Sequence, residues 1–201
     1  MEKKIFDQYI KDHWNTITEI GVRASELHDI ECNQKYDGMP YSYHLYNVGA
    51  VAITHGHYVC NFTDHILPII FGAYFHDAIE DARVTYNDVL KIAKTFMSEA
   101  QAIIATEIVY ALTDEKGRNR AERGSEKHYE DIRETQYAPF VKFADRLANT
   151  TYSVKQKSRM ADIYAKEYDD FFRKLGGEKY VPSELWKLMT DLFKEKYYEE
   201  V

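Results

Sequence analysis

Residues 65–81, HILPIIFGAYFHDAIED, join an apolar segment directly to a cluster of polar groups. The first part of this stretch is apolar enough to lie in a protein core. His76, Asp77, Glu80 and Asp81 follow it without a spacer. A carboxylate that is drawn into a core costs much free energy unless a cation or a metal ion neutralises it. Any fold of this chain therefore has to supply positive charge at this point.

The chain as a whole has helical spacing, because apolar residues recur every three to four positions in most segments. Thr85 with Asp88 and Ser98 with Gln101 have the spacing of capping boxes at two helix starts. We predict an all-α fold, a single-domain helical bundle over residues 1–201. The expected helices lie near residues 4–28, 41–57, 63–78, 86–96, 99–113, 139–155, 158–175 and 183–198.

Two segments are expected to lack regular structure. YDGMPYSYH, residues 36–44, contains an Asp-Gly pair but joins no alternating apolar runs, so we interpret it as a loop that leads into a helix. Residues 113–134 are polar and rich in both signs of charge. We expect a long surface loop there, and loops of this length are usually functional or disordered.

Composition narrows the class of protein. A net charge of −7 argues against a nucleic-acid polymer as the main partner. The longest apolar run is about half a membrane span and no signal peptide precedes it, so we expect neither membrane insertion nor secretion. Two cysteines without CxxC spacing indicate a cytoplasmic protein. The composition does not determine the oligomeric state, and a homo-oligomer is compatible with it.

Metal coordination would explain the paired His76-Asp77. Adjacent residues on a helix point about 100° apart, so both reach one point only where the helix end faces a shared cavity. A divalent metal supplies the missing charge, and imidazole with carboxylate suits Mn, Fe, Zn or Ni. Two further ligands are needed. His44 lies on the inner face of its predicted helix, and Asp145 lies on the apolar face of VKFADRLANT.

The order His44, His76-Asp77, Asp145 resembles that of the HD-domain metal-dependent phosphohydrolases. The surrounding motifs GMPYSYH, FHDAIEDARVT and VKFADRLAN are similar to those of the hydrolase domain of the RelA/SpoT alarmone enzymes, including the free-standing small alarmone hydrolases. The resemblance covers about residues 20–155. For the C-terminal helices, 156–201, we recognise no counterpart.

The resemblance implies that His44, His76, Asp77 and Asp145 hold one metal, Mn²⁺ in that family. It also implies that Glu80 and Asp81 form the acidic pair that orients and deprotonates the attacking water. The chemistry agrees, because a metal lowers the pKa of water and a nearby acceptor takes the proton. Glu80 lies one turn after His76, and Asp81 lies one turn after Asp77.

Cationic and amide groups stand at positions that contact nucleotide in that family. These are Arg23, Lys35, Lys142 and Asn149. Arg120 and Arg123, in the tract GRNRAER, are further candidates because guanidinium groups bind phosphate in a bidentate manner. The alternative for this tract is a solvated turn in which the arginines pair with neighbouring glutamates.

Three positions depart from the family pattern: Leu45 replaces a proline, Ala82 a threonine and Ala148 a histidine. None is a metal ligand, so we expect the metal site of the family to be retained. The substrate pocket need not be the same as in the family. Most tyrosines are expected to pack between helices. Tyr41 and Tyr152 are the exceptions to examine for base stacking, because each flanks a motif.

The resemblance implies a (p)ppGpp 3′-pyrophosphohydrolase that releases pyrophosphate from a guanosine alarmone. Two alternatives stay open. One is an HD-type nucleotidase or phosphatase for another small-molecule nucleotide, such as a 5′-nucleotide, an adenosine alarmone or NADPH. The other is a nucleotide sensor without catalytic activity, although an intact acidic pair has no evident purpose in a sensor.

Overall fold

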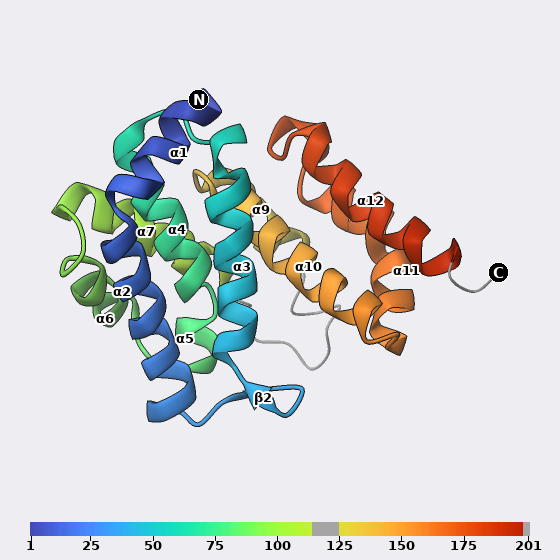
Figure 1. Cartoon of the computed structure of the whole chain (residues 1–201), viewed down its shortest axis with the longest axis horizontal. Helices are drawn as coiled ribbons and strands as arrows, with labels where there is room; N and C mark the ends of the chain where they lie inside the picture. Colours follow the sequence, from blue (N-terminus) through green and yellow to red (C-terminus); the bar gives the residue numbers. More distant parts are fainter. Residues whose placement is uncertain (114–124, 199–201) are drawn as a thin grey trace.

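The computed structural model describes residues 1–113 and 125–198. As predicted, these residues form an all-α fold, shown in Figure 1. The helices are α1 (Lys3–Asp12), α2 (Trp14–Ser25), α3 (Ser42–His55), α4 (Ile66–Phe75), α5 (Ala78–Asp81), α6 (Tyr86–Ala93), α7 (Glu99–Leu112), α9 (Glu126–Glu134), α10 (Ala138–Lys155), α11 (Arg159–Lys174) and α12 (Ser183–Tyr198). Short 3-10 turns lie at Gly56–Tyr58, Thr63–His65 and Gly177–Lys179.

Helix α4 is the centre of the fold, and every one of its residues is buried. Helices α2, α3, α7 and α10 pack against it. The packing is close: a Cβ added at Gly49 of α3 would lie 2.5 Å from the Tyr74 ring, and one at Gly72 would lie 2.6 Å from Ile108. The apolar segment that opened the sequence analysis is therefore the core helix of the protein.

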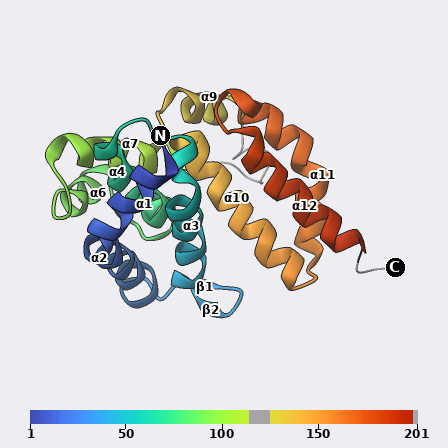
Figure 2. The same cartoon turned by 45° about the horizontal axis from the view of Figure 1, so that its top comes forward.

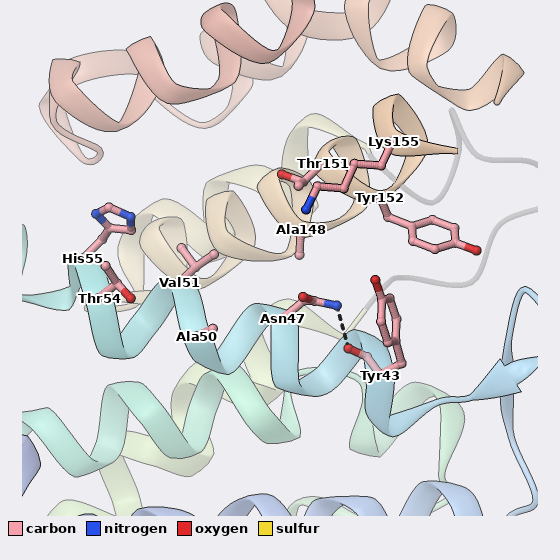
Figure 3. A pocket seen from close by; sticks show the side chains of 10 residues that line it. All are labelled: Tyr43, Asn47, Ala50, Val51, Thr54, His55, Ala148, Thr151, Tyr152 and Lys155. Atoms are coloured by element: carbon pink, nitrogen blue, oxygen red, sulfur yellow. Dashed lines mark hydrogen bonds between the residues drawn. The ribbon is translucent and has the colours of Figure 1, made fainter. Parts of the chain in front are cut away.

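Helix α10 connects the two ends of the molecule. It packs on α3, α4, α7 and α9, and also on α11 and α12. Figures 1 and 2 show α11 and α12 as an antiparallel pair beside α10, on the side away from α1 and α2. Helices α3 and α10 run side by side, as Figure 3 shows, with residues of both helices lining a groove between them. The volume of this groove is about 240 Å³.

Three local predictions were wrong. The helix expected over 4–28 is interrupted at His13 and ends in a π-helical turn, Glu26–Glu31. The break cannot be recognised in the sequence because the buried face continues across it, from Ile10 in α1 to Ile17 in α2.

The second correction concerns the Asp-Gly segment, which forms a small antiparallel hairpin instead of a loop. Strand β1 (Lys35–Tyr36) pairs with β2 (Met39–Pro40). Asp37 and Gly38 both have positive φ, 48° and 82°. This is the geometry of a two-residue hairpin turn. The strands are too short to show apolar alternation, so only the turn pair marks them.

The third correction concerns residues 113–134. Helix α9 occupies part of the predicted loop, and the Ser125 hydroxyl caps its first turn by accepting a hydrogen bond from the His128 N–H. His128, Tyr129 and Ile132 are buried on its inner face. The high charge of the segment hides this narrow buried stripe.

No helix within the described part of the chain is long and apolar enough to cross a membrane.

Candidate functional site

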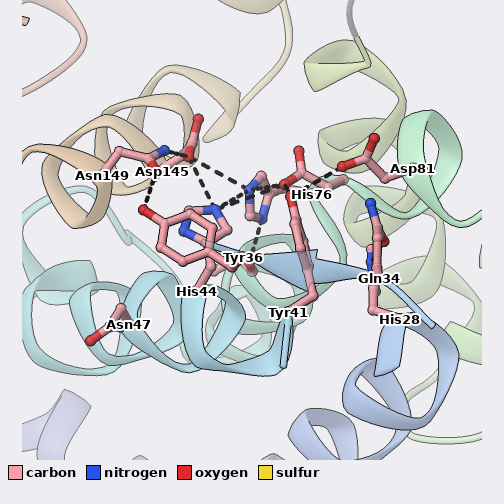
Figure 4. A network of polar contacts seen from close by, with 12 residues as sticks. His28, Gln34, Tyr36, Tyr41, His44, Asn47, His76, Asp81, Asp145 and Asn149 are labelled. Carbon is pink, nitrogen blue, oxygen red and sulfur yellow. Dashed lines mark hydrogen bonds and ion pairs between the residues drawn. The ribbon is translucent and has the colours of Figure 1, made fainter. Parts of the chain in front are cut away.

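Four of the predicted residues meet at one point. His44 comes from α3, His76 and Asp77 from the turn between α4 and α5, and Asp145 from α10. One ligand atom each of His44, His76 and Asp145 lie within 4.8 Å of one another. Asp77 Oδ2 lies 2.9 Å from His76 Nε2 and 3.8 Å from His44 Nε2. Figure 4 shows the two imidazole rings below the Asp145 carboxylate, and they meet edge to face, with centroids 5.2 Å apart and planes 67° apart.

The arrangement of lone pairs fits a metal ion. His76 Nδ1 lies 2.9 Å from the Ala73 carbonyl oxygen, which only accepts hydrogen bonds, so Nδ1 carries the proton in the neutral ring. Nε2 then presents its lone pair to the cluster, 3.2 Å from His44 Nε2. Two imidazole nitrogens and two carboxylate oxygens around one point suit a divalent cation.

Burial and the pKa shifts of the clustered side chains favour the binding of a cation. His44 and His76 are each 3% exposed. Burial lowers the pKa of His76, but the Asp77 and Asp145 carboxylates outweigh it and raise this pKa to about 9. Burial acts to raise the pKa of Asp145, yet a hydrogen bond with His44 and the charges of His76 and Lys142 lower it to about 2. The pKa of Asp77 is likewise lowered against burial, mainly by the charge of His76.

The predicted acidic pair lies on α5, the short helix directly after Asp77. Asp81 is connected to the cluster through Tyr41, whose hydroxyl oxygen lies 2.5 Å from Asp77 Oδ2 and 3.1 Å from Asp81 Oδ2. Glu80 precedes Asp81 on the same helix and is exposed to solvent. One tyrosine hydroxyl thus joins a candidate metal ligand to a candidate proton acceptor.

Two of the predicted substrate contacts lie in the cluster. The Asn149 amide donates to Asp145 Oδ1 over 2.5 Å and accepts a hydrogen bond from the Tyr36 hydroxyl over 2.8 Å. Lys142 Nζ lies 3.9 Å from Asp145 Oδ2. An ammonium at this distance can contact a phosphate group bound beside the carboxylate.

The other predicted substrate contacts differ in their surroundings. Arg23 is engaged by carboxylates, because its guanidinium lies 2.5 Å from Glu31 and 3.5 Å from Glu26. Lys35 is exposed on β1. Arg120 and Arg123 lie outside the described residues, so the proposed role of their tract stays a prediction.

Sequence reasoning missed Tyr36. Its ring stacks on the His44 imidazole, with centroids 4.9 Å apart and planes 11° apart. Its hydroxyl binds Asn149, which lies 113 positions away in the sequence. The hairpin turn at Asp37 and Gly38 brings this ring over the cluster, and the Asp-Gly pair was the only signal that could have revealed it.

Contacts on the other side of the Tyr41 ring fix its position. The ring stacks on His28, with centroids 5.0 Å apart and planes 11° apart. His28 is fully buried, and its Nδ1 lies 2.7 Å from Gln34 Oε1. The backbone N–H of Ser42 donates to Asp29 Oδ1 at the start of α3. These contacts fix the direction from which the Tyr41 hydroxyl approaches the two carboxylates.

The fold is similar to that of a solved metazoan protein described as an orthologue of SpoT that hydrolyses ppGpp and plays a role in starvation responses. The TM-score is 0.63 at 20% sequence identity, and the match covers 90% of this chain and 95% of the other. No protein-family model matches the chain, and no curated protein matches it. At this identity the likeness concerns the fold, and it confirms the fold that the motif resemblance predicted.

Proposed function

We propose that the chain is a metal-dependent phosphohydrolase, and that it releases pyrophosphate from the 3′ position of (p)ppGpp. The observation that carries the proposal is the convergence of two buried imidazoles and two carboxylates from three separate segments of the chain. The likeness to a ppGpp hydrolase supports the choice of substrate. In this reaction water and ppGpp give GDP and pyrophosphate.

The proposed metal ligands are His44, His76, Asp77 and Asp145, and Mn²⁺ is the metal that the motif resemblance favours. A divalent ion held there supplies Lewis acidity for polarising a phosphoryl oxygen and acidifying water. Carboxylates that stay ionised while partly buried, such as Asp77 and Asp145, attract such an ion. The free thiols Cys32 and Cys60 are compatible with the cytoplasmic location that we propose for the enzyme.

The remaining polar groups have distinct proposed roles. Glu80 and Asp81 accept the proton of the attacking water, with Asp81 oriented by the Tyr41 hydroxyl. Lys142 and Asn149, beside Asp145, contact the reacting phosphate group. Exposed Lys35 is available to phosphates that extend out of the site.

The test is a substrate panel. Metal-stripped protein is incubated with and without Mn²⁺ with ppGpp, pppGpp, the adenosine analogue, NADPH and 5′-nucleotides, and the products are separated by chromatography. We expect manganese-dependent release of pyrophosphate from ppGpp. Turnover of another panel member alone would refute the alarmone substrate and keep the hydrolase.

The control is the variant Asp77→Ala, which should fail to bind the metal because it lacks one of four ligands. Full metal occupancy in this variant would count against the proposed site. If the wild-type protein binds metal and nucleotide but turns over no member of the panel, the chain is a nucleotide sensor and the proposed activity is wrong.

A further inference from the structure

The groove between α3 and α10 begins next to the proposed metal site. On α3, Asn47 lies one turn after His44, and on α10, Ala148 lies one turn after Asp145. Residues one turn apart share a helix face. The groove therefore adjoins the helix faces that carry the proposed metal ligands, although α3 and α10 run in opposite directions along it, as Figure 3 shows.

Small or folded-back side chains keep the groove open. Ala50 and Ala148 line it from the two helices and add no bulk beyond Cβ. The Asn47 amide donates to the Tyr43 carbonyl oxygen of its own helix over 2.7 Å, as Figure 3 shows. The volume of the groove, about 240 Å³, is slightly below the roughly 300–1,000 Å³ of sites that hold a whole small molecule. This space suits one nucleoside unit.

One end of the groove is an aromatic wall. The rings of Tyr43 and Tyr152 meet edge to face, with centroids 5.7 Å apart. Tyr36 stands between this wall and the metal site, 5.0 Å from the Tyr152 centroid and stacked on His44. The Tyr152 hydroxyl donates to Asp37 Oδ2 over 2.7 Å, so the hairpin holds the wall in place. Rigid tyrosine rings offer apolar area to a planar base.

A cation faces the middle of the groove. Figure 3 shows the Lys155 side chain running back along α10, with its ammonium above Ala148. Within the described part of the chain, Lys155 makes no ion pair, and Lys155 is exposed. Thr151 stands beside it on the same wall of the groove. In a protein with a net charge of −7, an ammonium placed in this way favours an anionic group in the groove.

We propose that this groove is a subsite for the half of the nucleotide that is remote from the scissile phosphate. The base lies against the tyrosine wall and the alanine floor, and Lys155 binds the 5′-phosphate group. This inference rests on the proposed function, because it assumes that the reacting phosphate is held at the metal site. It adds where the base and the 5′-phosphate of that substrate are bound.

The test measures binding, so it does not depend on turnover. GDP and guanosine are titrated into the protein by calorimetry in the presence of Mn²⁺. Lys155→Ala should weaken GDP binding about five- to tenfold and leave guanosine binding unchanged, because only the phosphate loses its partner. Ala148→Phe, which fills the floor, should weaken binding of both ligands by more than tenfold.

Lys166→Ala is the matched control, because it removes an exposed lysine from α11, away from the groove. Thermal unfolding checks that the Ala148→Phe variant is folded. If that variant is unfolded, GDP binding by the surface variant Lys155→Ala alone tests the subsite. GDP binding that is equal in wild type, Lys155→Ala and Lys166→Ala would overturn the subsite. Turnover of ppGpp in that case would leave the proposed function standing, so the two failures are distinguishable.

Discussion

Replacing Tyr41 with Phe removes one hydroxyl from the centre of the site and leaves the rest of the side chain in place. The Tyr41 ring stacks on His28 with a centroid distance of 5.0 Å and meets the His44 ring edge to face at 5.7 Å. A phenylalanine ring keeps both contacts. What disappears is the shared oxygen, 2.5 Å from Asp77 and 3.1 Å from Asp81. The substitution therefore separates positioning from packing.

The expected loss follows from these two distances. A hydrogen bond to a charged group contributes about 1.5–3 kcal/mol, and the shorter contact, to Asp77, is of this kind. If all of that energy serves to orient the carboxylates in the transition state, kcat falls by roughly ten- to a hundredfold. KM should change by less than about twofold, because the hydroxyl binds two side chains of the protein instead of the substrate.

The assay is steady-state kinetics at saturating Mn²⁺ on the substrate that the panel identifies, with bound metal measured in the same samples. Tyr46→Phe is the matched control, since Tyr46 is 44% exposed on α3, the helix that begins directly after Tyr41, and contacts Tyr74. A Tyr41→Phe enzyme with full metal and wild-type kcat would refute the positioning role. A loss of metal together with kcat would show that Tyr41 acts on the ligand Asp77 alone.

Three further predictions test other parts of the molecule. Glu80→Gln should abolish turnover and leave metal binding intact in calorimetry, and unchanged turnover would remove Glu80 from the mechanism. The pKa of His76 is raised from 6.5 to about 9. Protonated His76 therefore stabilises the metal-free fold below pH 6.5, and this contribution is lost as the pH rises through about 9. Metal binding displaces the same proton, so Mn²⁺ affinity measured by calorimetry should increase about tenfold per pH unit between these values, and a flat profile would contradict the assignment. Gly49→Ala should lower the free energy of unfolding in urea by about 1–3 kcal/mol, because the new Cβ would lie 2.5 Å from Tyr74; an unchanged midpoint would disprove the close packing.

Local signals in the sequence predicted the helices well. Both capping boxes, Thr85 with Asp88 and Ser98 with Gln101, are complete in the structure, with the reciprocal hydrogen bonds present. These signals involve residues three positions apart, so chain connectivity alone brings them together. The break at His13 has no such signal, because the buried face continues on both sides of it.

The sequence predicted which residues of the candidate site come together, but it did not predict their geometry. Motif order singled out His44 and Asp145, and the structure brings their ligand atoms within 3.3 Å of each other. The contacts of Tyr36 with Asn149 depend on a hairpin that the sequence marks only by an Asp-Gly pair. Relative placement of segments so far apart follows from the packing of α3 and α10 on α4, and no local pattern encodes that packing.

The burial of α4 explains why the metal-binding and recognition regions of the site should respond differently to substitution. Because all of α4 is buried, His76 is drawn into the core, and the Ala73 carbonyl fixes its ring. A change there alters both stability and chemistry. The groove residues Tyr43 and Lys155 are exposed on α3 and α10. Substitutions at these positions change few core contacts, so they should alter nucleotide binding in the proposed subsite at little cost in stability.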